Sequence, residues 1–160
     1  MITSENSIRV RYDEVDKMGY VYHGNYAKYY HISRTELLRE AGICDKELEK
    51  HLVILPIIEM NIKYLKPVFY DDIIMIKTSL HDEPITRMTF FQEVYNQNNE
   101  LINEATSILV FVNSLTRKPT RVPDIISKKL QEHHKTSVHP KREDAIDEFL
   151  TKAHVGKQVL

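Results

Sequence analysis

The sequence predicts an α+β domain in which one long helix lies against a curved antiparallel sheet of about five strands. Two observations predict this class. Residues 26–41 have the periodicity of a single amphipathic helix, and residues 52–115 form four successive runs rich in Ile, Val and Tyr. The apolar face of this helix has to pack against other apolar residues, and the predicted sheet is the element that can cover it.

Residues 7–15 are predicted to form the first strand, because apolar and polar residues alternate there. Its apolar positions are Ile8, Val10 and Tyr12. The helix of residues 26–41 follows, and its buried face is expected to consist of Tyr26, Tyr30, Ser33, Leu37 and Ala41. Gly42 comes directly after this stripe and is expected to end the helix in the left-handed conformation.

The four β-rich runs are residues 52–69, 73–80, 85–95 and 101–115. Turn-forming Asp, Pro and Asn residues separate them, and the connections are too short for crossover helices. The four runs are therefore expected to pair as antiparallel strands. The sheet would keep free edges and an outer face, so a homo-oligomer, either a dimer or a tetramer, is expected to cover them.

The last run is followed by a basic loop at residues 116–121 and a short amphipathic helix at residues 123–134. We expect one domain over residues 1–134 and a polar C-terminal tail over residues 135–160, with a short helix in residues 144–153. One curved sheet wrapped around one helix is the hotdog fold.

Composition narrows the class of function. Hydrophobic residues make up 42% and charged residues 28% of the 160 residues, and the net charge of −1 favours neither nucleic acid nor an anionic membrane as partner. The N-terminus lacks the pattern of a signal peptide, and no apolar run has the length of a membrane helix. With Cys44 as the single cysteine, a cytoplasmic protein is expected.

Three stretches resemble the 4-hydroxybenzoyl-CoA thioesterase branch of the hotdog-fold superfamily. They are R-V-R-Y-D-E-V-D-K-M-G-Y-V-Y-H-G-N-Y, the helix Y-Y-H-I-S-R-T-E-L-L-R-E-A-G, and L-P-I-I-E-M-N-I-K-Y-L-K-P-V-F-Y-D-D. The resemblance covers residues 8–123 in the same order and implies hydrolysis of an acyl-CoA thioester. It places Asp16 at the catalytic aspartate and the His23 backbone N–H at the group that polarises the carbonyl.

This chemistry is sound on general grounds. A thioester carbonyl is electrophilic and its thiolate leaves readily, so one carboxylate acting as nucleophile or general base suffices. The N–H groups of Tyr22, His23 and Gly24, at the start of a helix, are expected to stabilise the oxyanion. No cofactor is expected, since CoA is part of the substrate, and no metal either, because the His residues lack ligand spacing.

Other residues are candidates for substrate binding, each with a structural alternative. Gly19 allows a backbone bend or close approach of substrate. Three tyrosines are expected to line an acyl pocket or to pack in the core: Tyr20, Tyr22 and Tyr26. Asn61 and Tyr64 are expected either to reach the site across a dimer interface or to be plain sheet positions. Arg34 and Glu36 are expected to form a surface or interface salt bridge.

The candidates for binding the CoA phosphates are Arg87, Arg117, Lys118 and Arg121, unless these cations are merely solvated. Two alternative functions remain open at this stage: a thioesterase acting on acyl carrier protein, and a non-catalytic module that binds acyl-CoA. A hotdog hydratase is disfavoured, because the sequence lacks the D-x-N-x-x-H pattern.

Overall fold

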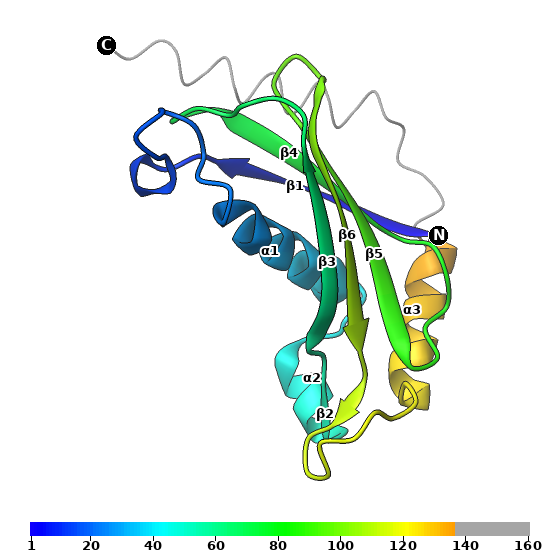
Figure 1. Cartoon of the computed structure of the whole chain (residues 1–160). Coiled ribbons are helices and arrows are strands. Elements are labelled where there is room, and N and C mark those ends of the chain that lie inside the picture. The colour runs from blue at the N-terminus through cyan, green and yellow to red at the C-terminus, as the bar shows by residue number, and fades with distance from the viewer. Residues whose placement is uncertain (137–160) are drawn as a thin grey trace.

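A five-stranded antiparallel sheet curves around the long helix α1, as predicted for a hotdog fold (Figure 1). The structure is a computed structural model that describes residues 1–136. The sheet order is β1-β4-β5-β6-β3, and β2 pairs with β7 in a separate two-stranded sheet. The elements are β1 (Ile2–Arg9), the 3₁₀ turn η1 (Tyr12–Glu14), α1 (Asn25–Glu40), α2 (Asp45–Lys50), β2 (Val53–Ile54), β3 (Ile57–Tyr64), β4 (Ile73–Leu80), β5 (Arg87–Tyr95), β6 (Leu101–Val110), β7 (Val112–Asn113) and α3 (Asp124–Thr136).

Helix α1 begins and ends within one residue of the predicted bounds. All members of the predicted apolar stripe are buried: Tyr26, Tyr30, Ser33, Leu37 and Ala41. Gly42 has a φ of +73° and its N–H donates to the Arg39 carbonyl, so the predicted left-handed helix end is confirmed.

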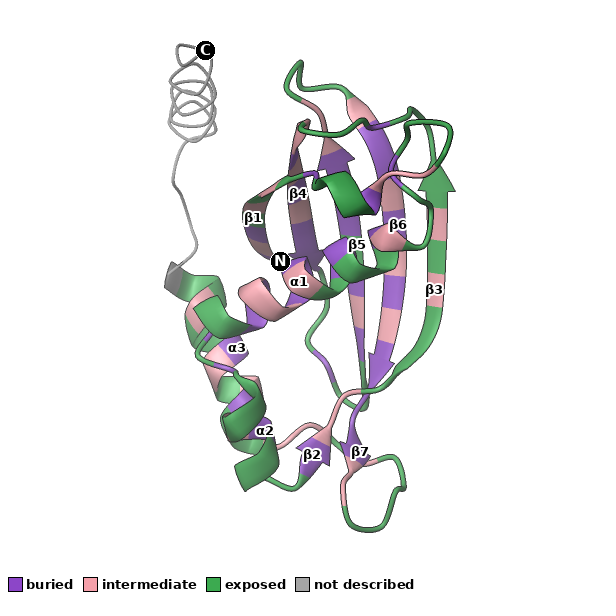
Figure 2. Cartoon of the chain, turned by 90° about the vertical axis from the view of Figure 1, so that its left-hand side faces the viewer, coloured by how far each residue is buried: buried purple, intermediate pink, exposed green. Residues whose placement is uncertain are grey.

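Strands β4 and β6 bury most of their residues, whereas β3 is mainly exposed (Figure 2). Strand β4 has the bounds that its run predicted; β1 pairs with it along its whole length, and β5 pairs with Met75–Leu80. Strand β3 pairs with β6 alone and therefore forms an edge of the sheet. The opposite edge, β1, packs its first residues near α3, because Ile2 belongs to the same buried cluster as Ile126 and Leu130.

Two elements near the chain start differ from the prediction. Strand β1 covers Ile2–Arg9 rather than residues 7–15, because its whole length pairs with β4. The chain then forms η1, where the Glu14 carboxylate accepts the Arg11 N–H and closes the turn. Helix α2, which follows α1 after a short connection, was not predicted.

The C-terminal helix α3 confirms the helix predicted for residues 123–134 and extends two residues further. The predicted helix of residues 144–153 lies outside the described residues. Among residues 1–136, no helix is long and apolar enough to cross a bilayer.

Arg34 is buried between α1 and the sheet, so the predicted salt bridge to Glu36 at the surface or an interface is wrong. It lies one turn after Tyr30 and so shares the buried face of the helix. Its Nη1 donates to Gln92 Oε1 at 3.2 Å and Ser107 Oγ at 3.1 Å. Burial lowers the pKa of Arg34 to about 10, and Glu36 pairs with Arg39 on the surface instead.

Candidate functional site

Asp16 lies in a short loop that the backbone closes tightly. Val15 and Val21 form a β-bridge at its base, and the Asp16 N–H donates to the Tyr20 carbonyl at 2.8 Å. The Gly19 N–H returns to the Asp16 carbonyl at 2.9 Å, with Gly19 at a φ of +83°. This φ favours glycine, so the predicted backbone bend at Gly19 is confirmed.

The two oxygens of the Asp16 carboxylate have different surroundings. Oδ1 accepts the Met18 N–H at 2.8 Å, which is the bond of an Asx turn. Within residues 1–136, no hydrogen bond or ion pair is found for Oδ2. Asp16 is half-buried, so one oxygen fixes the orientation of the carboxylate and the other remains open to a reactant.

The residues just before α1 provide one unused backbone donor next to this loop. The Asn25 N–H donates to the Tyr22 carbonyl and the Tyr26 N–H to the His23 carbonyl, so the first turn is already bonded. The Tyr22 N–H donates to the Glu14 carbonyl at 2.9 Å, which rules out its predicted role as an oxyanion donor. Within the described part of the chain, no hydrogen bond engages the His23 N–H.

The Asp16 loop, the start of α1 and the chain after β3 line a common cavity of about 400 Å³. Five predicted site residues line it: Asp16, Tyr20, His23, Tyr26 and Tyr64. The Tyr64 hydroxyl donates to the His23 carbonyl at 3.2 Å, and the Tyr26 and Tyr64 rings meet edge to face at 5.4 Å. Burial raises the pKa of Tyr26 to about 12, so its hydroxyl stays protonated at neutral pH.

The remaining lining residues were not predicted as site residues: Met18, Val21, Leu65, Lys66, Pro67 and Val68. Most belong to the connection between β3 and β4. That connection reaches the Asp16 loop through a bridge between Tyr20 and Phe69, whose rings lie 5.4 Å apart. The only sequence signal for it was the P-V-F-Y-D-D turn, which identifies a turn but not its neighbour.

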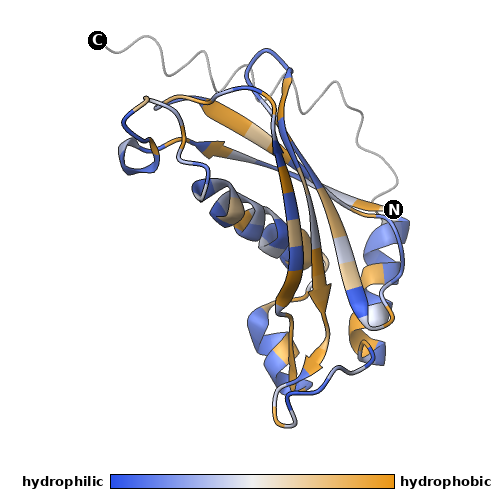
Figure 3. Cartoon of the chain, in the orientation of Figure 1, coloured by the Kyte–Doolittle hydropathy of each residue, from blue (hydrophilic) through white to orange (hydrophobic). Residues whose placement is uncertain are grey.

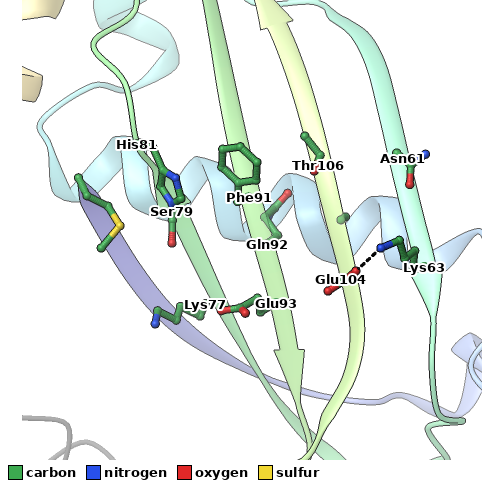
Figure 4. A pocket seen from close by; sticks show the side chains of 12 residues that line it. Asn61, Lys63, Lys77, Ser79, His81, Phe91, Gln92, Glu93, Glu104 and Thr106 are labelled. Atoms are coloured by element: carbon green, nitrogen blue, oxygen red, sulfur yellow. Dashed lines mark hydrogen bonds and ion pairs between the residues drawn. The ribbon is translucent and has the colours of Figure 1, made fainter.

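Three predicted substrate-binding residues do not line this cavity. Gly19 acts through the backbone of the loop. The Tyr22 ring is half exposed and lies against the His23 ring, above Gly24, where a Cβ would come within 2.6 Å of Tyr22 Cε1. Asn61 projects from the face of the sheet that points away from α1, where it lines a hollow with Thr106 and Phe91 (Figure 4).

The predicted CoA-binding cations lie far from Asp16 within one chain. Tyr64, at the end of β3, contacts the site, whereas the start of β3 lies at the opposite end of the molecule, near β2 and β7 (Figure 1). The loop after β7 carries three of the cations, Arg117, Lys118 and Arg121, and the fourth, Arg87, begins β5 opposite Val110. A single chain therefore does not bring these residues to the carboxylate.

The arrangement suits acyl transfer to a carboxylate or to water. Asp16 and His23 line one cavity, the His23 N–H just before the helix has no hydrogen bond within residues 1–136, and tyrosine rings line the same cavity. Within residues 1–136, no group of three or more His, Cys, Asp or Glu side chains is arranged to hold a metal ion.

Known proteins match this chain over most of its length. A sequence profile described as the thioesterase-like superfamily matches residues 10–130. The acyl-CoA thioester hydrolase YbgC of Escherichia coli is 34% identical over 119 residues, covering 74% of this chain and 89% of that protein. The DHNA-CoA thioesterase of Staphylococcus aureus superposes with a TM-score of 0.76 at 30% identity, covering 88% and 98% of the chains. The chloroplast acyl-acyl carrier protein thioesterase ATL3 of Arabidopsis thaliana is 31% identical over 126 residues, 78% of this chain and 66% of that protein.

Proposed function

The chain belongs to the thioesterase-like superfamily and is a thioester hydrolase, and we propose that it cleaves acyl-CoA with Asp16 as the reacting carboxylate. The observation that carries the proposal is the shared cavity of Asp16 and the unbonded His23 N–H. A thioester carbonyl placed between them would meet an attacking oxygen on one side and an oxyanion donor on the other.

Two routes use the same groups. In the first, Asp16 Oδ2 attacks the carbonyl carbon, the C–S bond breaks, and CoA leaves as a thiolate. Water then cleaves the resulting anhydride to the free acid and restores the carboxylate. In the second route, Asp16 takes a proton from a water that attacks the same carbon, the C–S bond breaks, and the CoA thiolate leaves and takes up the proton from Asp16. Each route requires an ionised Asp16, and in each the His23 N–H stabilises the charge on the carbonyl oxygen.

We propose that two chains complete the pocket by pairing their β3 edges. Strand β3 exposes apolar residues at its start, beside β2 and α2 (Figure 3), with Ile57 43% and Ile58 51% exposed. Antiparallel pairing about a two-fold axis would place the start of one β3 against the end of the other. The Asp16 cavity of one chain would then face the β2–β7 end of its partner.

This dimer would also bring predicted CoA-binding cations close to a reacting carboxylate. The loop with Arg117, Lys118 and Arg121 would approach the Asp16 cavity of the other chain, although it is distant in its own. All three residues are exposed, as a site for the CoA phosphates requires. The phosphates would therefore bind to one chain while the thioester reacts at the other.

Replacement of Asp16 by asparagine tests the proposal. An Asn side chain keeps an oxygen for the Met18 N–H but loses the charge, so the fold should persist while thiol release falls by at least about 10²-fold. Substrates should include short, long and aromatic acyl-CoA esters. Near-normal turnover by the variant would reject the role of Asp16.

The same panel separates the alternatives. Because the chain also resembles a thioesterase for acyl carrier protein, acyl carrier protein substrates belong in the panel. Faster turnover on the carrier protein than on CoA would move the assignment to that substrate. No thiol release from any substrate would favour a module that binds acyl-CoA without cleaving it.

A further inference from the structure

Glu14 is a buried carboxylate two residues before Asp16 that belongs neither to the cavity lining nor to the predicted site. Its side chain is only 4% exposed. Oε2 accepts the Arg11 N–H at 2.9 Å and the Tyr29 hydroxyl at 2.7 Å, and Oε1 pairs with Lys28 Nζ at 3.2 Å. Both carboxylate oxygens are therefore bonded, one of them to the η1 turn and both to the first residues of α1.

Such a group is stabilising only while its partners stay in place. Burial by itself would raise the pKa of the Glu14 carboxyl. The bonds from the Arg11 N–H, Tyr29 and Lys28, together with the Lys28 charge, outweigh burial and hold this pKa below its ordinary value. Glu14 is therefore ionised at neutral pH, and displacement of the helix from the turn would leave a buried charge without partners.

The backbone of Glu14 connects the same helix to the reacting groups. Its carbonyl accepts the Tyr22 N–H at 2.9 Å and the Asn25 Nδ2 at 2.8 Å, which fixes the residues on either side of His23. Val15, the next residue, forms the bridge that closes the Asp16 loop. One residue thus ties the carboxylate loop to the helix start from which the His23 N–H projects.

We propose that Glu14 is a positioning residue, which sets the distance between the Asp16 carboxylate and the His23 N–H. The inference rests on the proposed function of Asp16. A displacement of reacting groups by about 1 Å costs up to about 10²-fold in rate, so a group that fixes two reacting elements together affects kcat without touching the substrate.

The test is Glu14→Gln, assayed well below the unfolding temperature. An amide oxygen can replace Oε2 and keep the bonds to the Arg11 N–H and Tyr29, while the charge that pairs with Lys28 is lost. We expect kcat to fall by about 10-fold or more, with a smaller change in KM. Tyr29→Phe, which removes one bond from the helix side, should reproduce part of this loss and serves if the first variant does not fold.

Glu40→Gln is the matched control. Glu40 lies at the other end of α1 and ties the helix to β1 by accepting the Ser4 hydroxyl at 2.8 Å, so the chemical change is the same but remote from Asp16. Its kcat should stay within about 2-fold of wild type. Equal losses in the two variants would show that only helix anchoring matters and would overturn the inference.

A double-mutant cycle with Asp16→Asn separates the inference from the proposed function. If Glu14 acts by placing Asp16, Glu14→Gln should change the residual rate little once the carboxylate is gone. The same fold-loss in both backgrounds would reject positioning while leaving Asp16 as the catalytic residue. High turnover by Asp16→Asn alone would reject the proposed function, and the inference with it.

Discussion

Replacement of Ile58 by aspartate should separate the proposed dimer into monomers. Ile58 is 51% exposed and sits in β3 at the irregularity between Ile57 and Glu59, where no residue of β6 pairs with it. An edge strand with apolar residues and one unpaired side is a surface at which a second copy can add a strand. The substitution places one carboxylate in each half of that interface.

The size of the effect follows from the exposure and the symmetry. Full burial of an isoleucine is worth about 1.5–3 kcal/mol, so burial of the exposed half of Ile58 is worth about 1 kcal/mol. A buried, unpartnered polar group costs about 1–3 kcal/mol more, and a two-fold interface contains the change twice. The total of about 4–8 kcal/mol per dimer corresponds to a rise in the dissociation constant of about 10³- to 10⁶-fold.

The assay is light scattering after size exclusion, together with kcat measured across protein concentrations. Ile85→Asp is the matched control, because Ile85 is 64% exposed in the connection before β5, away from the β3 edge. We expect the Ile58 variant to be monomeric and nearly inactive, and the control to behave as wild type. A dimer that persists in the Ile58 variant, or a fully active monomer, would refute pairing through β3.

Two further predictions concern CoA binding and acid stability. Joint replacement of Arg117, Lys118 and Arg121 by alanine should raise KM for acyl-CoA more than it lowers kcat. KM for acyl-N-acetylcysteamine esters, which lack the phosphates, should stay unchanged. An unchanged KM for acyl-CoA would show that these cations are only solvated. Because the pKa of Glu14 is lowered in the folded chain, its contribution to the free energy of unfolding is present above its ordinary pKa of 4.5 and is lost as pH falls through the folded value. The stability difference between wild type and Glu14→Gln, measured by urea unfolding, should therefore shrink below pH 4.5, and a difference that stays constant through this range would contradict the ionised state of Glu14.

The elements that were predicted well each carry a clear pattern within their own stretch of sequence. Helix α1 was found almost to the residue because its stripe and Gly42 agree, and β4 because turn residues bound a short apolar run. Strand β1 was misplaced because alternation continues through Val10 and Tyr12, whereas the chain leaves the sheet at Arg9. Only pairing with β4 and the closure of η1 by Glu14 determine that end, and neither is a local property of the run.

The site residues were likewise predictable where the signal is local in the sequence and not where it depends on distant contacts. Asp16, His23 and Tyr26 lie within one short stretch, so sequence proximity was enough to place them together. The charge of Arg34 favours a salt bridge at the surface or an interface, although its spacing of one turn from Tyr30 places it on the buried face. The acceptors that make its burial tolerable lie on β5 and β6. The proposed role of Glu14 depends on its bond to Tyr29 of α1, 15 residues later, which no motif in the sequence predicts.

An aspartate in a loop can stabilise a turn or react with substrate, and the geometry makes these two roles compatible for Asp16. Its Oδ1 holds the Met18 N–H and so prevents free rotation of the carboxylate, while Oδ2 stays without a partner among residues 1–136. A carboxylate with both oxygens bonded would be a weaker nucleophile and a weaker base, and one with neither bonded would need to be ordered in every turnover. The turn bond thus supplies the orientation, and Glu14 relates that orientation to the helix start, so the rate should depend on both.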